Sequence, residues 1–286
     1  MARVAILGIP ISHVRYSVVD DEALCVVDIK YQNRNTDKQR KDLENLLSAV
    51  SNGIKVVDLG ELPHPDSSKI DYSKLAESAK KILQNAPADV IITVGHDHSA
   101  AFPLYAIPGN VLRLDAHGDA YMFKDADFTN FVISGANYMH YVAKQNLKRP
   151  EEVMNLGITP ENISTQYHGD GFFGSPVNLE DIAGIAKTKS VNLLDIDVDV
   201  LHRSFALPHS FRTSSLTPAD LADIIRATSP RIVGLFELVV SNGAPYQDVF
   251  QRRDLFAPLC EAVAQTAIAR SRSSPQNPQA SFVAYP

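Results

Sequence analysis

The sequence predicts an α/β fold of three layers, αβα, in which a mainly parallel β-sheet lies between two layers of helices. Along the chain, short apolar segments alternate with longer segments of helical periodicity. Most of the short segments are apolar at successive positions, which is typical of parallel strands covered on both faces. A chain of 286 residues is also long enough to bury a substantial core.

Seven apolar segments are predicted to form the strands of this sheet. They are residues 2–7, 54–59, 89–94, 111–115, 153–158, 190–197 and 231–238. Neither an internal repeat nor a linker interrupts them, so we expect residues 1–286 to form a single domain. Residues 271–286 are rich in Ser, Pro and Gln, and we expect them to be a mobile or docking tail.

Helices are predicted between these strands from their apolar stripes and their capping residues. The predicted segments are residues 73–85, 178–187, 217–227 and 254–270. The third of these has the clearest start, with Thr217 as N-cap, Pro218 at the first helical position and Asp220 in the first turn.

Composition narrows the range of partners and of cellular locations. The net charge is −6 and no run of Lys or Arg is present, so nucleic acids and anionic membranes are not expected partners. No apolar stretch reaches the length of a membrane span, and the first one is interpreted as a buried strand rather than a signal peptide. Cys25 and Cys260 have no CxxC spacing, so no disulfide framework is predicted. These features favour a cytoplasmic protein.

Three predicted strands end in clusters of ionisable residues. The clusters are His96, Asp97 and His98; Asp115, His117 and Asp119; and Asp195, Asp197 and Asp199. Residues two apart in an extended segment point to the same side, so each cluster is expected to direct its side chains into one cavity. Ligand sites of such sheets lie at the carboxyl ends of the strands.

A metal site explains these clusters better than capping does. A single strand-end aspartate is ordinarily a cap or turn residue, but several carboxylates at neighbouring strand ends repel one another unless a cation lies between them. Two divalent ions bridged by carboxylates remove this repulsion. Mixed His and Asp ligands without cysteine suit Mn²⁺ better than a structural zinc.

The motifs resemble those of the arginase and agmatinase (ureohydrolase) family over residues 50–240, as in a divergent member. DAHGD at 115–119 resembles the family motif DAHxD, GHDHS at 95–99 resembles GGDHS, and DIDVDVLHRSFA at 195–206 resembles SxDxDxLDPxFA. The resemblance implies an arginase/deacetylase-like fold and two Mn²⁺ ions per chain. It also implies that the chain is a homo-oligomer acting on a small-molecule substrate.

The resemblance also implies which residues bind each metal. One ion would be held by His98, Asp115, Asp119 and Asp197, and the other by Asp115, His117, Asp197 and Asp199, so that Asp115 and Asp197 bridge. His96 stands where the family has glycine, and Asp97 is expected to orient ligands through hydrogen bonds rather than bind metal.

In the family, a hydroxide that bridges the metals attacks the guanidinium or amidine-like carbon, and a C–N bond is cleaved. By the resemblance, Asp119 would orient this nucleophile. SGANYMH at 134–140 resembles the family's SGNLHG, which makes His140 the candidate general acid and Asn137 a candidate substrate-binding residue. The alternative is that Tyr138 and the two residues after it only begin a helix over the sheet.

The departures from the family concentrate on the substrate side. Val239 stands where the family has the glutamate that grips the guanidinium group, and Glu237 is the candidate substitute. His202 and Arg203 replace the family's Asp-Pro, and Asp195 replaces its serine. The sequence therefore predicts a metal-dependent hydrolase of a guanidino, formimino or related substrate. Two alternatives stay open, a deacetylase-like amide hydrolase with one zinc and a non-catalytic metal-binding relative.

Overall fold

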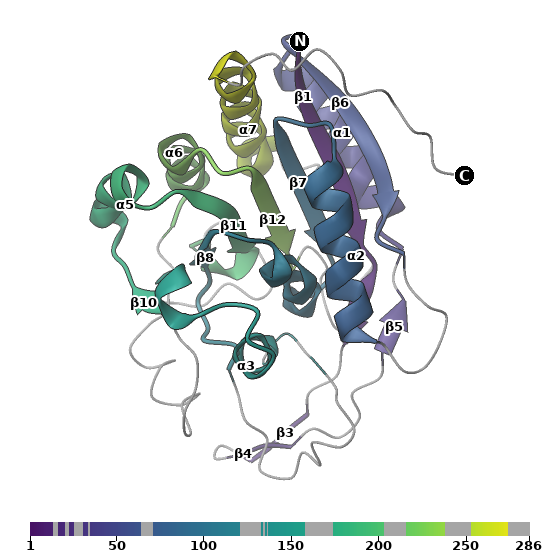
Figure 1. Cartoon of the computed structure of the whole chain (residues 1–286), viewed down its shortest axis with the longest axis vertical. Helices are drawn as coiled ribbons and strands as arrows, with labels where there is room; N and C mark the ends of the chain where they lie inside the picture. The colour runs from purple at the N-terminus through teal and green to yellow at the C-terminus, as the bar shows by residue number, and fades with distance from the viewer. Residues whose placement is uncertain are drawn as a thin grey trace.

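The computed structural model contains one parallel sheet of eight strands in the order β10-β9-β8-β11-β12-β7-β1-β6 (Figure 1). It describes residues 1–13, 17–20, 23–25, 31–33, 35–63, 71–120, 133, 135, 137–157, 174–202, 216–237 and 253–273. The strands are β1 (Ala2–Ile9), β6 (Ile54–Glu61), β7 (Val90–Gly95), β8 (Asn110–Leu114), β9 (Val153–Leu156), β10 (Ser175–Pro176), β11 (Val191–Asp197) and β12 (Ile232–Phe236). Every strand pair in this sheet is parallel.

Two apolar layers cover the sheet, one on each face. One buried cluster joins the sheet to α1 (Asp37–Val50), α5 (Ile182–Thr188), α6 (Pro218–Thr228) and α7 (Arg253–Ser273). The other joins it to α2 (Tyr72–Asn85), the 3₁₀ helix η1 (His98–Ala106) and α3 (Tyr138–Lys144). Successive strand residues enter opposite clusters, as Val4 and Ala5 do, which confirms the predicted αβα layering.

The predicted strands are all present, with ends that differ by one or two residues. The short β10 was not predicted, nor were the antiparallel pairs β2 (Ile11–His13) with β5 (Tyr31–Asn33) and β3 (Ser17–Asp20) with β4 (Ala23–Cys25). Helix α6 begins as predicted, because the Thr217 side chain accepts a hydrogen bond from the Asp220 N–H and Pro218 follows the cap.

The helices differ from the prediction in two places. Helix α1 was not predicted, because its buried face includes Gln39 and Arg40 and so lacks a clear apolar stripe. The predicted tail began at residue 271, but α7 continues to Ser273, and residues 274–286 lie outside the described residues. Within the described part of the chain, no helix is both long and apolar enough to cross a membrane.

The sheet order brings the motif-bearing strands together. Strands β8, β11, β12 and β7 are consecutive neighbours, and the three ionisable clusters lie at the carboxyl ends of β7, β8 and β11. All of these strands are parallel, so their carboxyl ends meet at one edge of the sheet. The fold therefore gathers residues that are about a hundred positions apart in the sequence, such as His98 and Asp197.

Candidate metal centre

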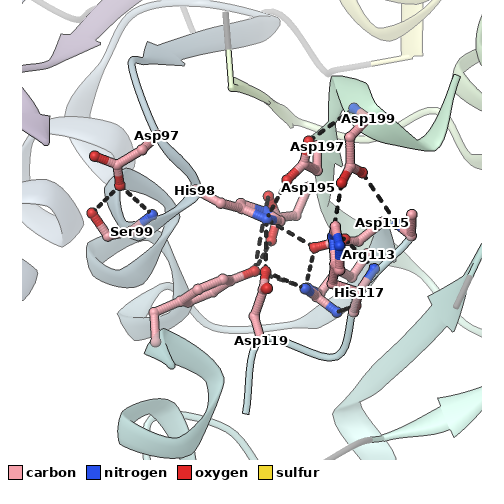
Figure 2. Close-up of polar contacts among 12 residues, drawn as sticks. Asp97, His98, Ser99, Arg113, Asp115, His117, Asp119, Asp195, Asp197 and Asp199 are labelled. Atoms are coloured by element: carbon pink, nitrogen blue, oxygen red, sulfur yellow. Dashed lines mark hydrogen bonds and ion pairs between the residues drawn. The ribbon is translucent and has the colours of Figure 1, made fainter. Parts of the chain in front are cut away.

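The side chains at this edge converge into two groups with the composition of metal sites. In the first group, His98, Asp115, Asp119 and Asp197 offer ligand atoms that all lie within 4.8 Å of one another. In the second, Asp115, His117 and Asp199 do the same. Figure 2 shows these side chains pointing toward one another from the ends of their strands. Asp115 belongs to both groups, as a ligand that bridges two ions would.

His98 provides the most direct test of whether a cation fits the first group. Its Nδ1 atom lies 2.8 Å from Asp115 Oδ2, 2.9 Å from Asp119 Oδ2 and 3.1 Å from Asp197 Oδ2. Despite these three oxygens, Nδ1 is buried without a hydrogen bond of acceptable geometry. A buried nitrogen facing several carboxylate oxygens, but bonded to none of them, fits a divalent cation between them.

The rest of the His98 ring is fixed by its neighbours. Its Nε2 atom lies 3.1 Å from Asp195 Oδ1 and 3.1 Å from the Tyr138 hydroxyl. The Phe236 ring stacks on the imidazole at 5.6 Å between centroids. A hydrogen bond from one ring nitrogen to a carboxylate sets the tautomer and frees the other nitrogen for a metal. Asp195 thus lies behind His98 and belongs to neither ligand group.

The second group is arranged around the half-buried His117. Its Nδ1 atom lies 2.8 Å from Asp199 Oδ2 and 3.5 Å from Asp115 Oδ1. The carboxylates are oriented by backbone amides, since the His117 N–H donates to Asp115 Oδ1 at 2.6 Å and the Ala116 N–H to Asp199 Oδ1 at 3.2 Å. Such bonds hold the ligands in place before any metal binds.

The structure modifies the expectation that each cluster points to one side. Strand β11 ends at Asp197, and residues Val198–Val200 form a 3₁₀ turn, so the alternation stops there. Asp197 belongs to the first group and Asp199 to the second, and the bridging role that the resemblance implies for Asp197 stays a prediction. After β8, Asp119 adopts a φ of 49°, so this cluster is not extended either.

The structure also places a residue in the centre that the sequence analysis missed. Arg113, which is 1% exposed, donates from Nη2 to Asp119 Oδ2 at 2.6 Å and also to Asp115 Oδ2. A signal was present, because an arginine interrupts the apolar strand VLRL two positions before Asp115. Residues two apart on a strand share a side, so this arginine was placed to face the ligands.

Crowding of like charges shifts the pKa values of the clustered acids. Burial and the neighbouring Asp115 raise the pKa of Asp119 to about 6. Burial and the charge of Asp199 raise the pKa of Asp197 well above its usual range. The opposite holds for Asp115, where burial is outweighed by Arg113 and His98 and the pKa is held well below its usual range. The raised pKa values of Asp119 and Asp197 reflect the concentration of negative charge in the centre.

The electrostatic surroundings of His117 favour its protonated form in the metal-free protein. Burial acts against protonation of His117, but hydrogen bonds to Asp115 and Asp199 raise its pKa to about 12. A metal ligand must be deprotonated, so Mn²⁺ binding is expected to release at least one proton at pH 8. Mn²⁺ affinity should therefore fall about tenfold per pH unit, per proton released, as the pH is lowered. Calorimetry in buffers of different ionisation enthalpy measures the release, and binding without it would contradict this prediction.

The two remaining residues of the first cluster point away from the ligand groups. Asp97 Oδ1 accepts a hydrogen bond from the Ser99 N–H at 2.8 Å and so caps η1 (Figure 2). The His96 ring lies 3.2 Å from Gln39 Nε2 and 3.1 Å from the Asn35 carbonyl oxygen, on the α1 side. Neither residue belongs to a ligand group.

Glu237 lies at the same edge of the sheet, directly after β12. It has a φ of 60°, a left-handed conformation that is uncommon for a residue other than glycine and is found at functional sites. A Cβ built on Gly135 would lie 3.5 Å from Glu237 Oε1 and 3.8 Å from the His98 backbone nitrogen. Burial and the charges of Asp199 and Asp97 raise the pKa of Glu237 to about 8. Glu237 Oε1 and the His98 backbone thus both lie close to Gly135.

The other predicted site residues lie near this edge or outside the described residues. Asn137 is buried and directly precedes α3, and His140 is in the first turn of that helix. Helix α3 begins at Tyr138, and the roles of Asn137 and His140 stay predictions. Val239 and Arg203 lie outside the described residues.

Several solved structures have a similar fold. An agmatine ureohydrolase of Thermoplasma volcanium is 14% identical, with a TM-score of 0.63 over 95% of this chain and 92% of the other. A formimidoylglutamase from Bacillus subtilis is 13% identical, with a TM-score of 0.61 over 96% and 88%. A hypothetical agmatinase from Burkholderia thailandensis is 18% identical, with a TM-score of 0.57 over 95% and 87%. At these identities the likeness shows the arginase-like α/β fold.

Sequence comparison adds evidence of family membership. No curated protein matches the sequence. The model of the arginase family, however, matches residues 2–172, and this range contains β1 through β9 and both the GHDHS and DAHGD motifs. The match covers more than half of the 286 residues, and the chain therefore belongs to the arginase family.

Proposed function

We propose that this protein is a binuclear manganese-dependent hydrolase of the ureohydrolase type, which cleaves a C–N bond in a small guanidino, formimino or related substrate. The observation that carries the proposal is the pair of ligand groups sharing Asp115, with the unbonded His98 Nδ1 facing three carboxylates. The names of the structural neighbours, an agmatine ureohydrolase and a formimidoylglutamase, support this class of reaction.

The proposed ligands are the residues of the two groups. They are His98, Asp115, Asp119 and Asp197 for one ion, and Asp115, His117 and Asp199 for the other. When bound, a pair of divalent ions lowers the pKa of a shared water and so supplies a nucleophile near neutral pH. Ligands that combine imidazole and carboxylate without a thiolate suit Mn²⁺.

Two side chains are proposed to handle the protons of the reaction. Asp119, held by Arg113 at 2.6 Å, is proposed to accept a hydrogen bond from the attacking water and to orient it. His140 is proposed to deliver a proton to the departing amine. Burial and the charge of Lys144 lower the pKa of His140, so its ring is neutral at pH 7 and can take up a proton before passing it on.

Glu237 and Asn137 are proposed to bind the substrate. A guanidinium or amidinium group is cationic, and Glu237 adds a carboxyl beside Asp199 and Asp97, where the local charge already favours a cation. Gly135 lies beside Glu237 and His98, which brings the segment leading to Asn137 close to the same carboxyl. The single-zinc, deacetylase-like alternative has less support, because a single ion would leave one of the two ligand groups without a role.

The test follows the consumption of candidate substrates by NMR with Mn²⁺-loaded protein. The panel contains arginine, agmatine, guanidinobutyrate, guanidinopropionate, formiminoglutamate and acetylated amines, with Asp197→Ala as the control. Consumption of a guanidino or formimino compound that is lost in the control is the expected result. Consumption of only the acetylated amines would favour the deacetylase-like reaction. No consumption by protein that holds two ions would instead favour the non-catalytic relative.

A further inference from the structure

Arg113 has contacts that the proposed reaction does not require. The side chain is fully enclosed, and its donors are distributed over three sides. Nε donates to the Tyr138 hydroxyl at 2.8 Å, Nη1 to the His117 carbonyl oxygen at 2.8 Å, and Nη2 to Asp119 and Asp115. The guanidinium carbon also lies 5.6 Å from the centre of the Tyr138 ring. These contacts fix the position of the Arg113 side chain.

The oxygens bound by Arg113 are the ones that face the first metal group. Asp115 Oδ2 and Asp119 Oδ2 contact the guanidinium and also lie 2.8 and 2.9 Å from His98 Nδ1. In Figure 2 the guanidinium lies between the two carboxylates. A carboxylate oxygen has two lone pairs, so each of these oxygens can accept an Arg113 N–H and still bind an ion.

The charge of Arg113 matters because the centre is so acidic. Five buried aspartates lie in or beside the two groups, namely Asp115, Asp119, Asp195, Asp197 and Asp199. Among the residues described, Arg113 is the one arginine or lysine recorded in an ion pair with any of them. Without metal it therefore offsets part of a repulsion that would otherwise oppose folding.

Asp195 complements this arrangement from the neighbouring strand. It pairs with Arg113 in the register of β11 and β8. Its Oδ2 accepts hydrogen bonds from the hydroxyls of Tyr105 at 2.6 Å and Tyr138 at 3.2 Å, and Tyr138 in turn accepts from Arg113. Arg113 and Asp195 together add no net charge. The Arg113 guanidinium contacts Asp115 and Asp119, and the Asp195 carboxylate contacts His98.

We propose that Arg113 is a resident counter-cation, which holds Asp115 and Asp119 in position when the metals are absent and whose stabilising effect the metals largely replace when they bind. The inference rests on the proposed metal site. If the charge of Arg113 stabilises the metal-free protein more than the metal-bound protein, linkage requires that it weakens metal binding by the same free energy. Arg113 would thus keep the empty site folded at the cost of some metal affinity.

The experiment compares the Tm of wild type, Arg113→Gln and Arg113→Lys, each stripped by a chelator and each loaded with Mn²⁺. Arg113→Gln is expected to lower the metal-free Tm by about 10 °C or more, because it removes the positive charge that is paired with the two buried carboxylates of Asp115 and Asp119. The Tm of the Mn²⁺-loaded variant should fall by less than half as much. Mn²⁺ should therefore raise the Tm of Arg113→Gln by more than it raises the Tm of the wild type. Arg113→Lys keeps the charge and should retain most of the metal-free stability.

Unfolding of stripped Arg113→Gln, with folding restored by Mn²⁺, is the extreme form of the expected result. If Arg113→Gln lost the same Tm in the stripped and the loaded state, Arg113 would have a structural role alone and the inference would be overturned. The inference would also be overturned if stripped Arg113→Lys were as unstable as stripped Arg113→Gln. Absence of Mn²⁺ binding to the wild type would overturn the metal-site proposal itself, a failure distinct from equal losses in a protein that does bind metal.

Discussion

Replacement of Asp115 by Asn is expected to reduce the bound Mn²⁺ from two ions per chain to at most one and to abolish most turnover. Asp115 is the residue shared by both ligand groups, and an amide supplies neither the charge nor the bridging geometry of a carboxylate. Loss of a residue that only orients a ligand typically costs about 10–100-fold, so loss of the shared ligand should exceed about 100-fold in kcat/KM.

The matched control is the same substitution at Asp89. Asp89 Oδ2 accepts a hydrogen bond from the Arg3 N–H at 2.8 Å, just before β7 and therefore at the opposite edge of the sheet. Asp89→Asn should retain both ions and wild-type turnover. Metal analysis of gel-filtered protein and the rate with the identified substrate measure both effects, and full metal content in Asp115→Asn would show that the ligand assignment is wrong.

Truncation of Phe236 is expected to have the largest effect on stability among the residues around the centre. The ring is fully buried and stacks on His98, and Gly95 and Gly234 leave room for it. A Cβ on Gly95 would lie 2.9 Å from the ring, and one on Gly234 would lie 2.5 Å from it. Phe236→Ala should cost about 3–5 kcal/mol in the free energy of unfolding, since so large a cavity closes only partly.

The same variant should weaken Mn²⁺ binding, because the His98 ring loses the surface that fixes its orientation. We expect a loss of about 10–100-fold in affinity. Phe256→Ala is the control, since Phe256 is also buried but lies in α7 among the core residues of the other face of the sheet. It should lose comparable stability in denaturant unfolding and retain its Mn²⁺ affinity. Equal affinity in both variants would argue against the role of Phe236 in holding His98.

The sequence predicted the parts of this molecule in which local pattern and structure coincide. Buried parallel strands are continuous apolar runs, so β1, β7 and β11 could be located within two residues. Carboxyl ends of parallel strands meet at one edge, so the convergence of His98, Asp115 and Asp197 also followed.

The features that were missed depend on contacts between distant segments. Arg113 has its role because β8 pairs with β11 and because α3 brings Tyr138 over it. The left-handed φ of Glu237 leaves no mark in the local sequence. Asp197 and Asp199 enter different groups because a 3₁₀ turn replaces the strand at Val198, which alternation alone did not predict.

Anomalous diffraction at the manganese absorption edge, from crystals of the Mn²⁺-loaded protein, tests the binuclear centre most directly. We predict two peaks per chain, separated by about 3.5–4 Å as in two-metal sites. One should lie among His98, Asp115, Asp119 and Asp197, and the other beside His117 and Asp199, with Asp115 contacting both. A single peak, or none at these residues, would contradict the binuclear centre and with it the proposed reaction.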